Sequence, residues 1–187
     1  ASPEDSNRDL AAYTARVEES ILEAARTALG RLEPARIGAG QGRANVNINR
    51  RARFHDGSWW LGYNPDGHSD KTLGVVKIER PNGELIALLA NYAVHGTSMG
   101  QENKAITSDN LGAAARYVEE RYQGKAVALW ASGAAGDQAP LYDRDPSRFT
   151  GVLNVGYLLA EEAVRVAGEI QASEPASIRA ARRVVSC

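Results

Sequence analysis

The sequence predicts an α/β fold, in which a mixed β-sheet is flanked by helices and forms an incomplete part of a larger domain. Strand-like and helix-like segments alternate in its second half, the pattern of layered α/β proteins. Leu85–Val94 is apolar nearly throughout, as expected of a central strand covered on both faces. Ala1–Arg8 and Ser173–Cys187 resemble linkers or partners of structure lying elsewhere. We therefore expect one partial domain over residues 1–187.

The first third of the chain predicts a helix followed by strands. Apolar residues recur every three or four positions from Asp9 to Leu32, and Gly30 is a stop signal, so this segment is expected to be an amphipathic helix. Ala35–Phe54 alternates small, apolar and polar residues, which is typical of strands. Asp56-Gly57 and Asn64–Gly67 are turn sequences, and we expect an exposed loop between them.

The remaining segments predict a hairpin, followed by a helix, a strand, a loop and a second helix. Pro81-Asn82-Gly83 separates two β-rich runs and is typical of a hairpin turn. The expected elements are strands at Thr72–Glu79 and Leu85–Val94, a helix from Ser108 or Asp109 to Tyr122, a strand at Ala126–Ala131, a loop at Gly133–Asp145 and a helix at Phe149–Ile170.

Charge and composition exclude several classes of partner. The 187 residues are 43% apolar and 24% charged, within the range of one globular domain. The formal net charge is −1 with acids and bases interspersed, so we expect no nucleic-acid partner, and no block of charge favours an anionic membrane. No stretch approaches the length of a transmembrane helix. Cys187 is the single cysteine, which excludes an internal disulfide and leaves the compartment undetermined.

His95 is the first candidate for a chemical role. It ends the most apolar strand, and the carboxyl ends of strands are where α/β proteins bind ligands. A neutral imidazole there suits Zn²⁺, whereas the alternative is a structural histidine that is hydrogen-bonded within the fold. His55 and His68 lie in polar, turn-rich loops and are assigned no role.

Asparagines form a second candidate site. Asn45, Asn47 and Asn49 would share one face of a strand, with Arg50 on the other. Because asparagine is disfavoured in strands, the repetition indicates either a buried hydrogen-bonding network or an edge that faces substrate.

Two further segments leave alternatives open. The small residues of Ala131–Pro140 allow a ligand to approach, although the loop lacks the lysine and hydroxyl of a phosphate-binding loop. Its Asp137 could be a catalytic base, a carboxylate supporting a metal ligand, or a brace for the loop. Trp59, Trp60 and Tyr63 could form a hydrophobic lip for substrate or pack within a long loop.

Five segments taken together resemble the neutral, non-lysosomal ceramidase family in order and spacing, over roughly Ala35–Pro140. They are NVNINRR, Asp70-Lys71 before LGVVKIE, LLANYAVHGTSMG, SDNLGAAARYVEE and GAAGDQAP. An ordered set of this kind is far more specific than any one short motif.

The resemblance implies a zinc-dependent hydrolase that cleaves the amide bond of N-acyl sphingoid bases. It implies that His95 is a metal ligand and that Arg50 lies at the substrate-binding site. Asn49 is the second candidate for substrate binding, and Asp137 is the candidate catalytic residue. The expected substrate is then a lipid or small-molecule amide, and a secreted or periplasmic location would follow.

The chain departs from the family pattern at two points. Ala139 stands where the family loop has a serine, so a serine nucleophile is absent, although a zinc-bound hydroxide could attack a carbonyl directly. The histidine-threonine-histidine, glutamate and tyrosine motifs that supply the other zinc ligands do not occur. One zinc ligand is thus expected here and the others outside these residues.

Three readings therefore remain. The first is part of a zinc-dependent amidase that is inactive when this chain is isolated. The second is a non-catalytic binding or structural domain that kept the scaffold and lost the nucleophile. The third is a small-molecule-binding α/β protein of accidental similarity. Zinc content separates the first from the third, and amide hydrolysis separates the first from the second.

Overall fold

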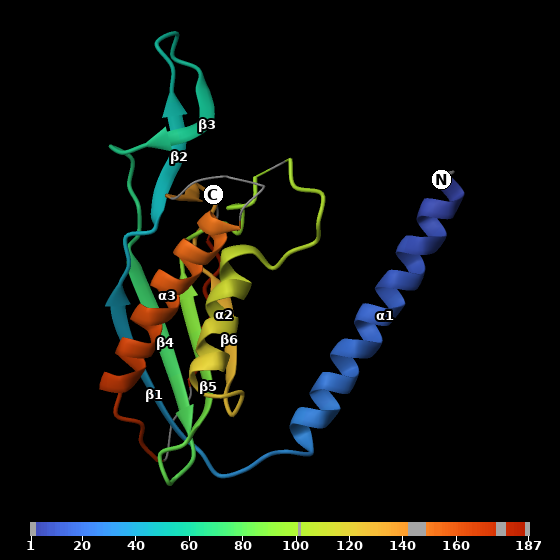
Figure 1. Cartoon of the computed structure of the whole chain (residues 1–187), viewed down its shortest axis with the longest axis vertical. Helices are drawn as coiled ribbons and strands as arrows, with labels where there is room; N and C mark the ends of the chain where they lie inside the picture. The colour runs from blue at the N-terminus through green and yellow to red at the C-terminus, as the bar shows by residue number, and fades with distance from the viewer. Residues whose placement is uncertain (1–2, 101, 142–148, 175–178, 186–187) are drawn as a thin grey trace. The chain divides into compact units, whose positions relative to one another are not determined.

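The computed structural model describes residues 3–100, 102–141, 149–174 and 179–185, and the chain divides into two compact units, Ala1–Pro34 and Ala35–Cys187 (Figure 1). The first unit contains helix α1 (Pro3–Leu29), which confirms the predicted helix and ends three residues earlier than expected. The helix also begins six residues before Asp9, so most of Ala1–Arg8, predicted to be a linker or a partner of other structure, is helical. That residues 1–187 form a single partial domain stays a prediction.

The second unit is built on a mixed four-stranded sheet, which confirms the predicted fold class. The strand order is β1-β4-β5-β6, with bounds β1 (Arg36–Arg43), β4 (Thr72–Glu79), β5 (Leu85–Tyr92) and β6 (Val127–Ser132). The β1, β4 and β5 strands are antiparallel, and β6 is parallel to β5. The predicted hairpin joins β4 to β5 through a turn in which Gly83 adopts a φ of 90°.

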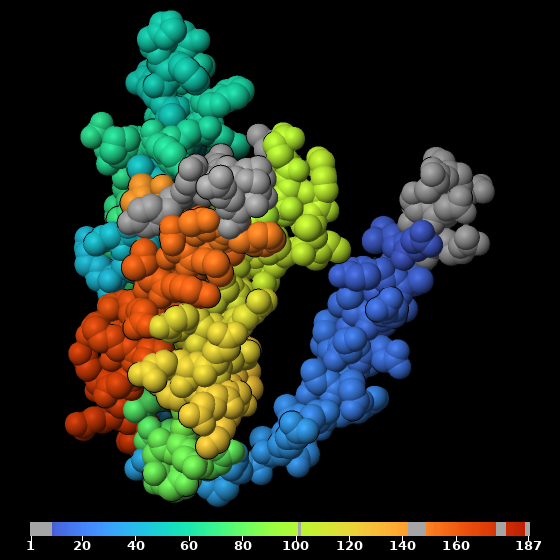
Figure 2. All heavy atoms as spheres, in the orientation of Figure 1, coloured from blue at the N-terminus to red at the C-terminus, as the bar shows by residue number. Residues whose placement is uncertain are grey.

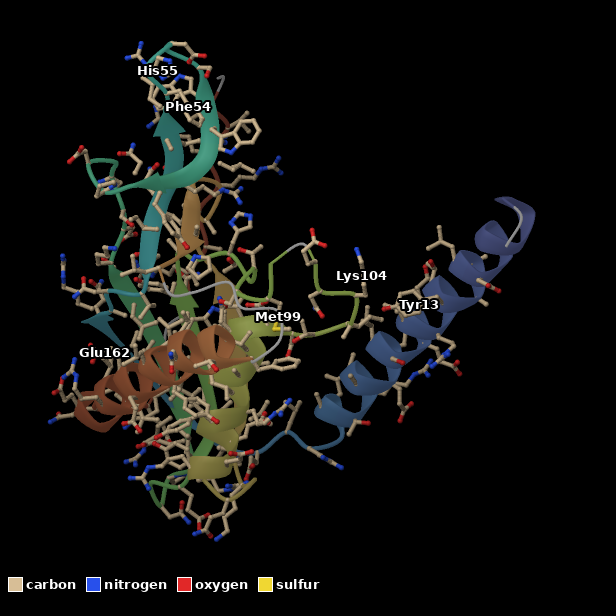
Figure 3. All side chains as sticks on the ribbon, turned by 45° about the horizontal axis from the view of Figure 1, so that its top comes forward. Tyr13, Phe54, His55, Met99, Lys104 and Glu162 are labelled. Carbon is tan, nitrogen blue, oxygen red and sulfur yellow. The ribbon has the colours of Figure 1, made fainter. Side chains whose placement is uncertain are left out.

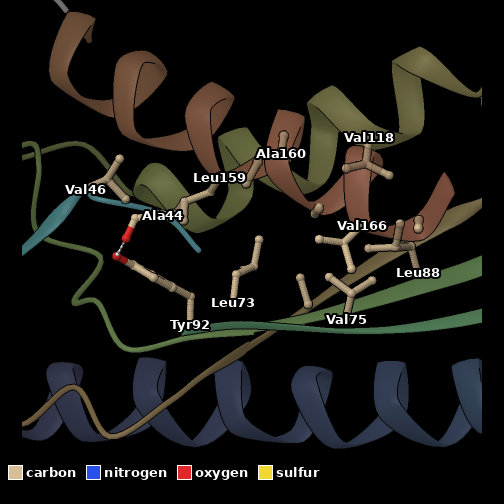
Figure 4. Close-up of a cluster of buried hydrophobic side chains, with 14 of the residues drawn as sticks. Ala44, Val46, Leu73, Val75, Leu88, Tyr92, Val118, Leu159, Ala160 and Val166 are labelled. Carbon is tan, nitrogen blue, oxygen red and sulfur yellow. Dashed lines mark hydrogen bonds between the residues drawn. The ribbon is translucent and has the colours of Figure 1, made fainter. Parts of the chain in front are cut away.

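Helices α2 (Asp109–Arg121) and α3 (Thr150–Glu169) cover one face of this sheet (Figure 1). Alternate residues of β4 and β5 point into the core, and buried residues recur along α3 at helical spacing. The resulting core is drawn in Figure 4 and includes Leu73, Val75, Leu88, Tyr92, Val118, Leu159 and Val166. Burial of these side chains is the main source of the unit's stability.

The opposite sheet face is aliphatic and partly open. In the described part of residues 35–187, Leu89 of β5 is half-buried, and Val127 and Leu129 of β6 are 54% and 53% exposed. These three side chains share a face because Leu89 pairs with Leu129, and Ala87 pairs with Val127. Within this unit, β5 is therefore covered on one face, whereas its apolar sequence predicts cover on both.

A second sheet of order β3-β2-β7 adjoins the end of the first. It consists of β2 (Asn47–Arg53), β3 (Trp59–Asn64) and β7 (Gln138–Pro140). The predicted exposed loop between the two turn sequences is wrong, because Trp59–Asn64 pairs with β2 as a hairpin strand. Its aromatic residues have high β propensity, and the two turn sequences lie at the strand's ends.

The loop predicted at Gly133–Asp145 contains β7, which pairs with β2, and residues 142–145 lie outside the described residues. In Ser173–Cys187, which the sequence predicts to be a linker or a partner of structure lying elsewhere, Ser173 makes an isolated bridge to Ile37. Residues 175–178 and 186–187 of this segment lie outside the described residues. Among the described helices, none has the length and apolarity needed to cross a bilayer.

Candidate functional site

His95 lies three residues beyond β5 and is fixed through its backbone. Its N–H donates to the carbonyl of Gln138 (3.2 Å), and its own carbonyl accepts a hydrogen bond from Nδ2 of Asn110 (3.1 Å). The ring atom Nδ1 is buried and has no hydrogen-bond partner in the described part of the chain. Such orphaned polar atoms are rare in folded proteins, and a metal ion is one group that can satisfy this nitrogen.

The described residues do not by themselves make a metal centre. They contain no group of three or more histidine, cysteine, aspartate or glutamate side chains placed to hold an ion. Catalytic zinc uses about three protein ligands. The described residues therefore suit His95 as one contributed ligand and do not suit a complete zinc site.

Asp109 holds the loop that follows His95. Its buried carboxylate accepts hydrogen bonds from the backbone N–H groups of Ser98 (2.9 Å), Met99 (3.1 Å) and Asn110 (2.7 Å). Asp109 also has a φ of 53°, a conformation that costs energy for a non-glycine residue and tends to occur at functional sites. From the sequence we expect Asp109 only to begin or cap a helix, and its hydrogen bonds to the preceding loop are not predicted. The run Ser108-Asp109-Asn110, which follows a loop containing Gly96 and Gly100, could have indicated this role.

Asn47 is the centre of a buried polar network. Its Nδ2 donates to the carbonyls of Asp70 (2.8 Å) and Ala93 (2.6 Å), and its Oδ1 lies 2.8 Å from Nζ of Lys71 and 2.9 Å from the hydroxyl of Tyr92. Burial raises the pKa of Tyr92 to about 12, so the hydroxyl stays protonated and remains a donor. The network fastens β2 to the end of β5.

Asn49 and Asp137 extend this network. Nδ2 of Asn49 donates to the carbonyl of His68 and to Oδ2 of Asp137, both at 2.9 Å, and its Oδ1 accepts the N–H of Arg51. Hydrogen bonds from Gln138 and then Asn49 lower the pKa of Asp137. A carboxylate held ionised in this way is a weak base, so the geometry favours the loop-brace interpretation of Asp137.

Of the two alternatives for the asparagines, the geometry favours the buried network. Asn47 and Asn49 are buried, whereas Asn45 is exposed and precedes β2. Both amide hydrogens of Asn49 are donated to groups inside the protein. The substrate-binding role of this residue stays a prediction. Gln138, which is 2% exposed, belongs to the same network and was missed by sequence reasoning.

Arg50 lies between this network and a cavity. Its Nε and Nη2 donate to the carbonyl of Gly136 at 3.1 and 2.9 Å, and its backbone N–H donates to the carbonyl of Asp137 at 2.7 Å. The side chain also lines the cavity. Arg50 is thus placed both to hold the loop bearing Asp137 and to meet a ligand.

The cavity has a volume of about 640 Å³ and lies between the β2–β3 hairpin and the segment after His95. Its hairpin wall is Arg50, Arg51, Trp59, Trp60 and Leu61, and its other wall is Gly96, Thr97, Met99, Gly100, Asn103, Thr107 and Asp109. Figure 3 marks Met99 on this second wall. His95 is adjacent in sequence to the lining and is not part of it.

The remaining singled-out residues contribute little side-chain chemistry. His55 is exposed near the end of the hairpin (Figure 3), and His68 enters the network through its backbone carbonyl. Ala139, at the family's serine position, is 1% exposed in β7 opposite Ile48 and offers no hydroxyl.

The fold and the site define an α/β protein with a cavity lined by the β2–β3 hairpin and by the segment that follows β5. The chain belongs to the neutral/alkaline non-lysosomal ceramidase family, because residues 9–145 match the N-terminal part of that family. This confirms the resemblance inferred from the five segments.

Individual relatives agree with this assignment. The chain is 30% identical over 165 residues to neutral ceramidase of Pseudomonas aeruginosa, covering 83% of this chain and 24% of that protein. It is 37% identical over 116 residues to neutral ceramidase of Drosophila pseudoobscura pseudoobscura, covering 51% of this chain and 15% of that protein. The crystal structure of the Pseudomonas aeruginosa neutral ceramidase matches with a TM-score of 0.67 at 26% identity, covering 81% of this chain and 25% of that one. The chain thus spans about a quarter or less of the length of these relatives.

Proposed function

We propose that this chain is the central part of the N-terminal catalytic domain of an amide hydrolase that acts on ceramide-like N-acyl lipids and uses a zinc ion to which His95 contributes one ligand. Family membership supports the reaction class. The observation that carries the metal assignment is Nδ1 of His95, which is buried and has no hydrogen-bond partner among the described residues. The next residue in the sequence, Gly96, lines the 640 Å³ cavity. A secreted or periplasmic location belongs to the same proposal and rests on the resemblance alone.

In this proposal the chain's own residues orient His95 and the loop that follows it, and they bind the substrate. Asn110 and the backbone of Gln138 hold the main chain of His95, and Asp109 holds the following loop. Arg50 offers its remaining N–H donors to a substrate oxygen, and the aromatic wall contacts an acyl or sphingoid chain. Bound zinc would supply a polarised carbonyl or an acidic water, and its other ligands would come from outside these residues.

A second candidate function is a non-catalytic lipid-binding domain. Ala139 favours it, because this position cannot supply a nucleophilic hydroxyl. The cavity and the polar network would then serve binding alone. Turnover of an N-acyl sphingosine by the longer polypeptide separates the two functions.

The deciding experiment replaces His95 in the longer polypeptide that carries this chain. We expect His95→Ala to abolish stoichiometric zinc, measured by elemental analysis, and to abolish hydrolysis of a short-chain N-acyl sphingosine. His55→Ala is the matched control, since His55 is exposed and should leave both quantities unchanged. Unchanged zinc in folded His95→Ala protein would overturn the ligand assignment, and an inactive wild type that holds zinc would favour the binding domain.

A further inference from the structure

The β2–β3 hairpin exposes an unusual number of large apolar side chains. Trp59 and Trp60 are 61% and 65% exposed, and Phe54, Leu61 and Tyr63 are also exposed. Figure 2 shows the hairpin's side chains, in teal, standing clear of the two packed helices of the second unit. Contiguous apolar surface of this kind marks an interaction site.

Both faces of the hairpin carry large apolar side chains. Trp59 and Leu61 pair across the strands with Arg53 and Arg51, so these four side chains share one face. On the other face, Trp60 pairs with Ala52, and its ring meets that of Phe54 edge-on at 6.3 Å. A hairpin that packs on a protein surface buries one face and leaves the other polar. Apolar side chains on both faces suit a medium that surrounds the hairpin's end.

The hairpin also has a basic character. Between Asn47 and Asn64 the sequence holds three arginines and one aspartate. That aspartate, Asp56, accepts hydrogen bonds from Ser58 within the turn. The guanidinium of Arg53 lies 5.7 Å from the ring centre of Trp59, and Arg51 is exposed beside it. Tryptophan, tyrosine and arginine together are typical of a bilayer interface, where rings lie at headgroup depth and guanidinium groups meet lipid phosphates.

The open face of the four-stranded sheet offers a contrast. It is aliphatic, carrying Leu89, Val127 and Leu129, and lies on a regular sheet. Such a face is what a helix or another sheet covers in layered folds. The two exposed apolar surfaces thus differ in composition and geometry, and the hairpin is the one that suits lipid.

We propose that the β2–β3 hairpin docks on the surface of a lipid bilayer, with its rings among the headgroups and its arginines against lipid phosphates. Trp59, Trp60 and Leu61 also line the cavity, so docking brings the cavity wall to the lipid. The insertion is shallow, because an open two-stranded ribbon has unpaired backbone groups that the hydrocarbon region would not satisfy. Docking goes beyond the proposed function, since it requires no hydrolysis.

The test uses the 187-residue chain and phosphatidylcholine vesicles that contain no N-acyl sphingoid lipid. The sequence has three tryptophans, so Trp130→Phe leaves only the two of the hairpin to report. Nε1 of Trp130 is buried without a partner among the described residues, so its removal is tolerable. We expect a blue shift on vesicle addition and quenching by lipids brominated near the headgroup end of the chains. Absence of both would overturn the proposal.

Variants locate the contact. We expect the double variant Trp59→Ser, Trp60→Ser to co-sediment with vesicles at least tenfold more weakly than wild type, and Arg51→Gln, Arg53→Gln to weaken it by a smaller factor. Leu129→Ser is the matched control, because it removes an exposed apolar side chain from the open sheet face. Circular dichroism verifies that each variant is folded. Wild-type binding by the tryptophan variant, or loss of binding in Leu129→Ser instead, would contradict docking through the hairpin.

Discussion

At the scale of single residues, the chain stabilises its loops with buried polar side chains. Asn47, Asn49, Asp109 and Gln138 each have their hydrogen bonds to the backbone or to one another, and each is buried. Removing one member of such a network leaves its partners unsatisfied, which costs more than the bond itself contributes. Substitutions here should therefore act strongly and locally.

Asp137→Asn should destabilise the second unit by about 1–3 kcal/mol at pH 7, since an amide cannot accept from both Asn49 and Gln138 without turning a donor toward one of them. The pKa of Asp137 is lowered in the folded protein, so its stabilisation is present above the ordinary carboxyl pKa of about 3.9 and is lost as pH falls through the folded value. Urea unfolding at pH 7 and below pH 4 should show that the difference in unfolding free energy between Asp137→Asn and wild type becomes smaller in acid. Asp66→Asn, in an exposed turn, is the control, and an equal pH dependence in both variants would contradict the brace.

Arg50→Ala should lower kcat/KM of the longer polypeptide by about 10- to 100-fold with zinc retained. Charge-assisted hydrogen bonds contribute about 1.5–3 kcal/mol, and each 1.4 kcal/mol is a tenfold rate change. The lost donors are those to Gly136 and to the cavity. With a water-soluble short-chain substrate, Arg53→Ala should stay near wild type. Wild-type kinetics in Arg50→Ala would make that residue structural only.

The sequence predicts the residues of this region better than their partners. The alternation of residues indicated that Asn47 and Asn49 share one face of a strand. It did not decide between a buried hydrogen-bonding network and an edge that faces substrate, because a strand pattern does not show what lies against that face. Asn45 follows the same alternation and is exposed, since β2 begins at Asn47. Gln138 and Asp109 act through contacts 69 or 70 and 10 or 11 residues away, which local patterns do not reveal.

At the scale of elements, periodicity predicted the long segments and failed at the short ones. The bounds of α2, β4 and α3 agree with expectation to within about one residue at each end. The β3 strand was missed because turn residues at both of its ends suggested a loop, although its aromatic composition favours a strand. The β7 strand has three residues and exists only through pairing with β2.

The crossing of α2 and α3 depends on one glycine. A Cβ at Gly156 would lie 2.7 Å from Cβ of Ala113 and 2.8 Å from the carbonyl oxygen of Asn110, so Gly156→Ala should force the helices apart and destabilise the unit by about 1–3 kcal/mol. In the same helix, a Cβ at Gly168 would meet no atom within 4 Å, so Gly168→Ala should stabilise it by about 0.5–1 kcal/mol. Thermal unfolding of both variants checks the pair. Equal effects of like sign would mean that helix propensity, and not the close approach, governs position 156.

At the scale of the whole molecule, the proposed zinc site would take its other ligands from residues outside this chain. The fold class and the family could be predicted from the sequence, because the succession of strands and helices and the order of the family motifs are both visible in it. The remainder of the proposed zinc site was not, since the described residues contain no metal-ligating group of three. A relative such as the Pseudomonas aeruginosa neutral ceramidase is about four times longer than the matched part.

The 187-residue chain alone should bind zinc more weakly than about 1 μM and hydrolyse no amide, because tight catalytic sites combine about three protein ligands and His95 is the one supported here. Calorimetric titration with zinc, paired with an assay on a short-chain N-acyl sphingosine, measures both. Submicromolar affinity or measurable turnover would mean that the chain carries a complete centre.

The outer edge of β6 has a consequence for handling the protein. In the part of the chain that the structure describes, β6 pairs with β5 alone, so it is an edge strand, and its Val127 and Leu129 are exposed. The N–H of Ala128 donates to Glu119, and no other strand pairs with this edge among the described residues. An apolar strand with a free edge is a template on which a second molecule can add its own strand. Preparations of this segment will therefore tend to form sheet-extended oligomers and precipitate on concentration. A charged residue at position 129 should slow that process without touching the cavity, which Leu129 does not line.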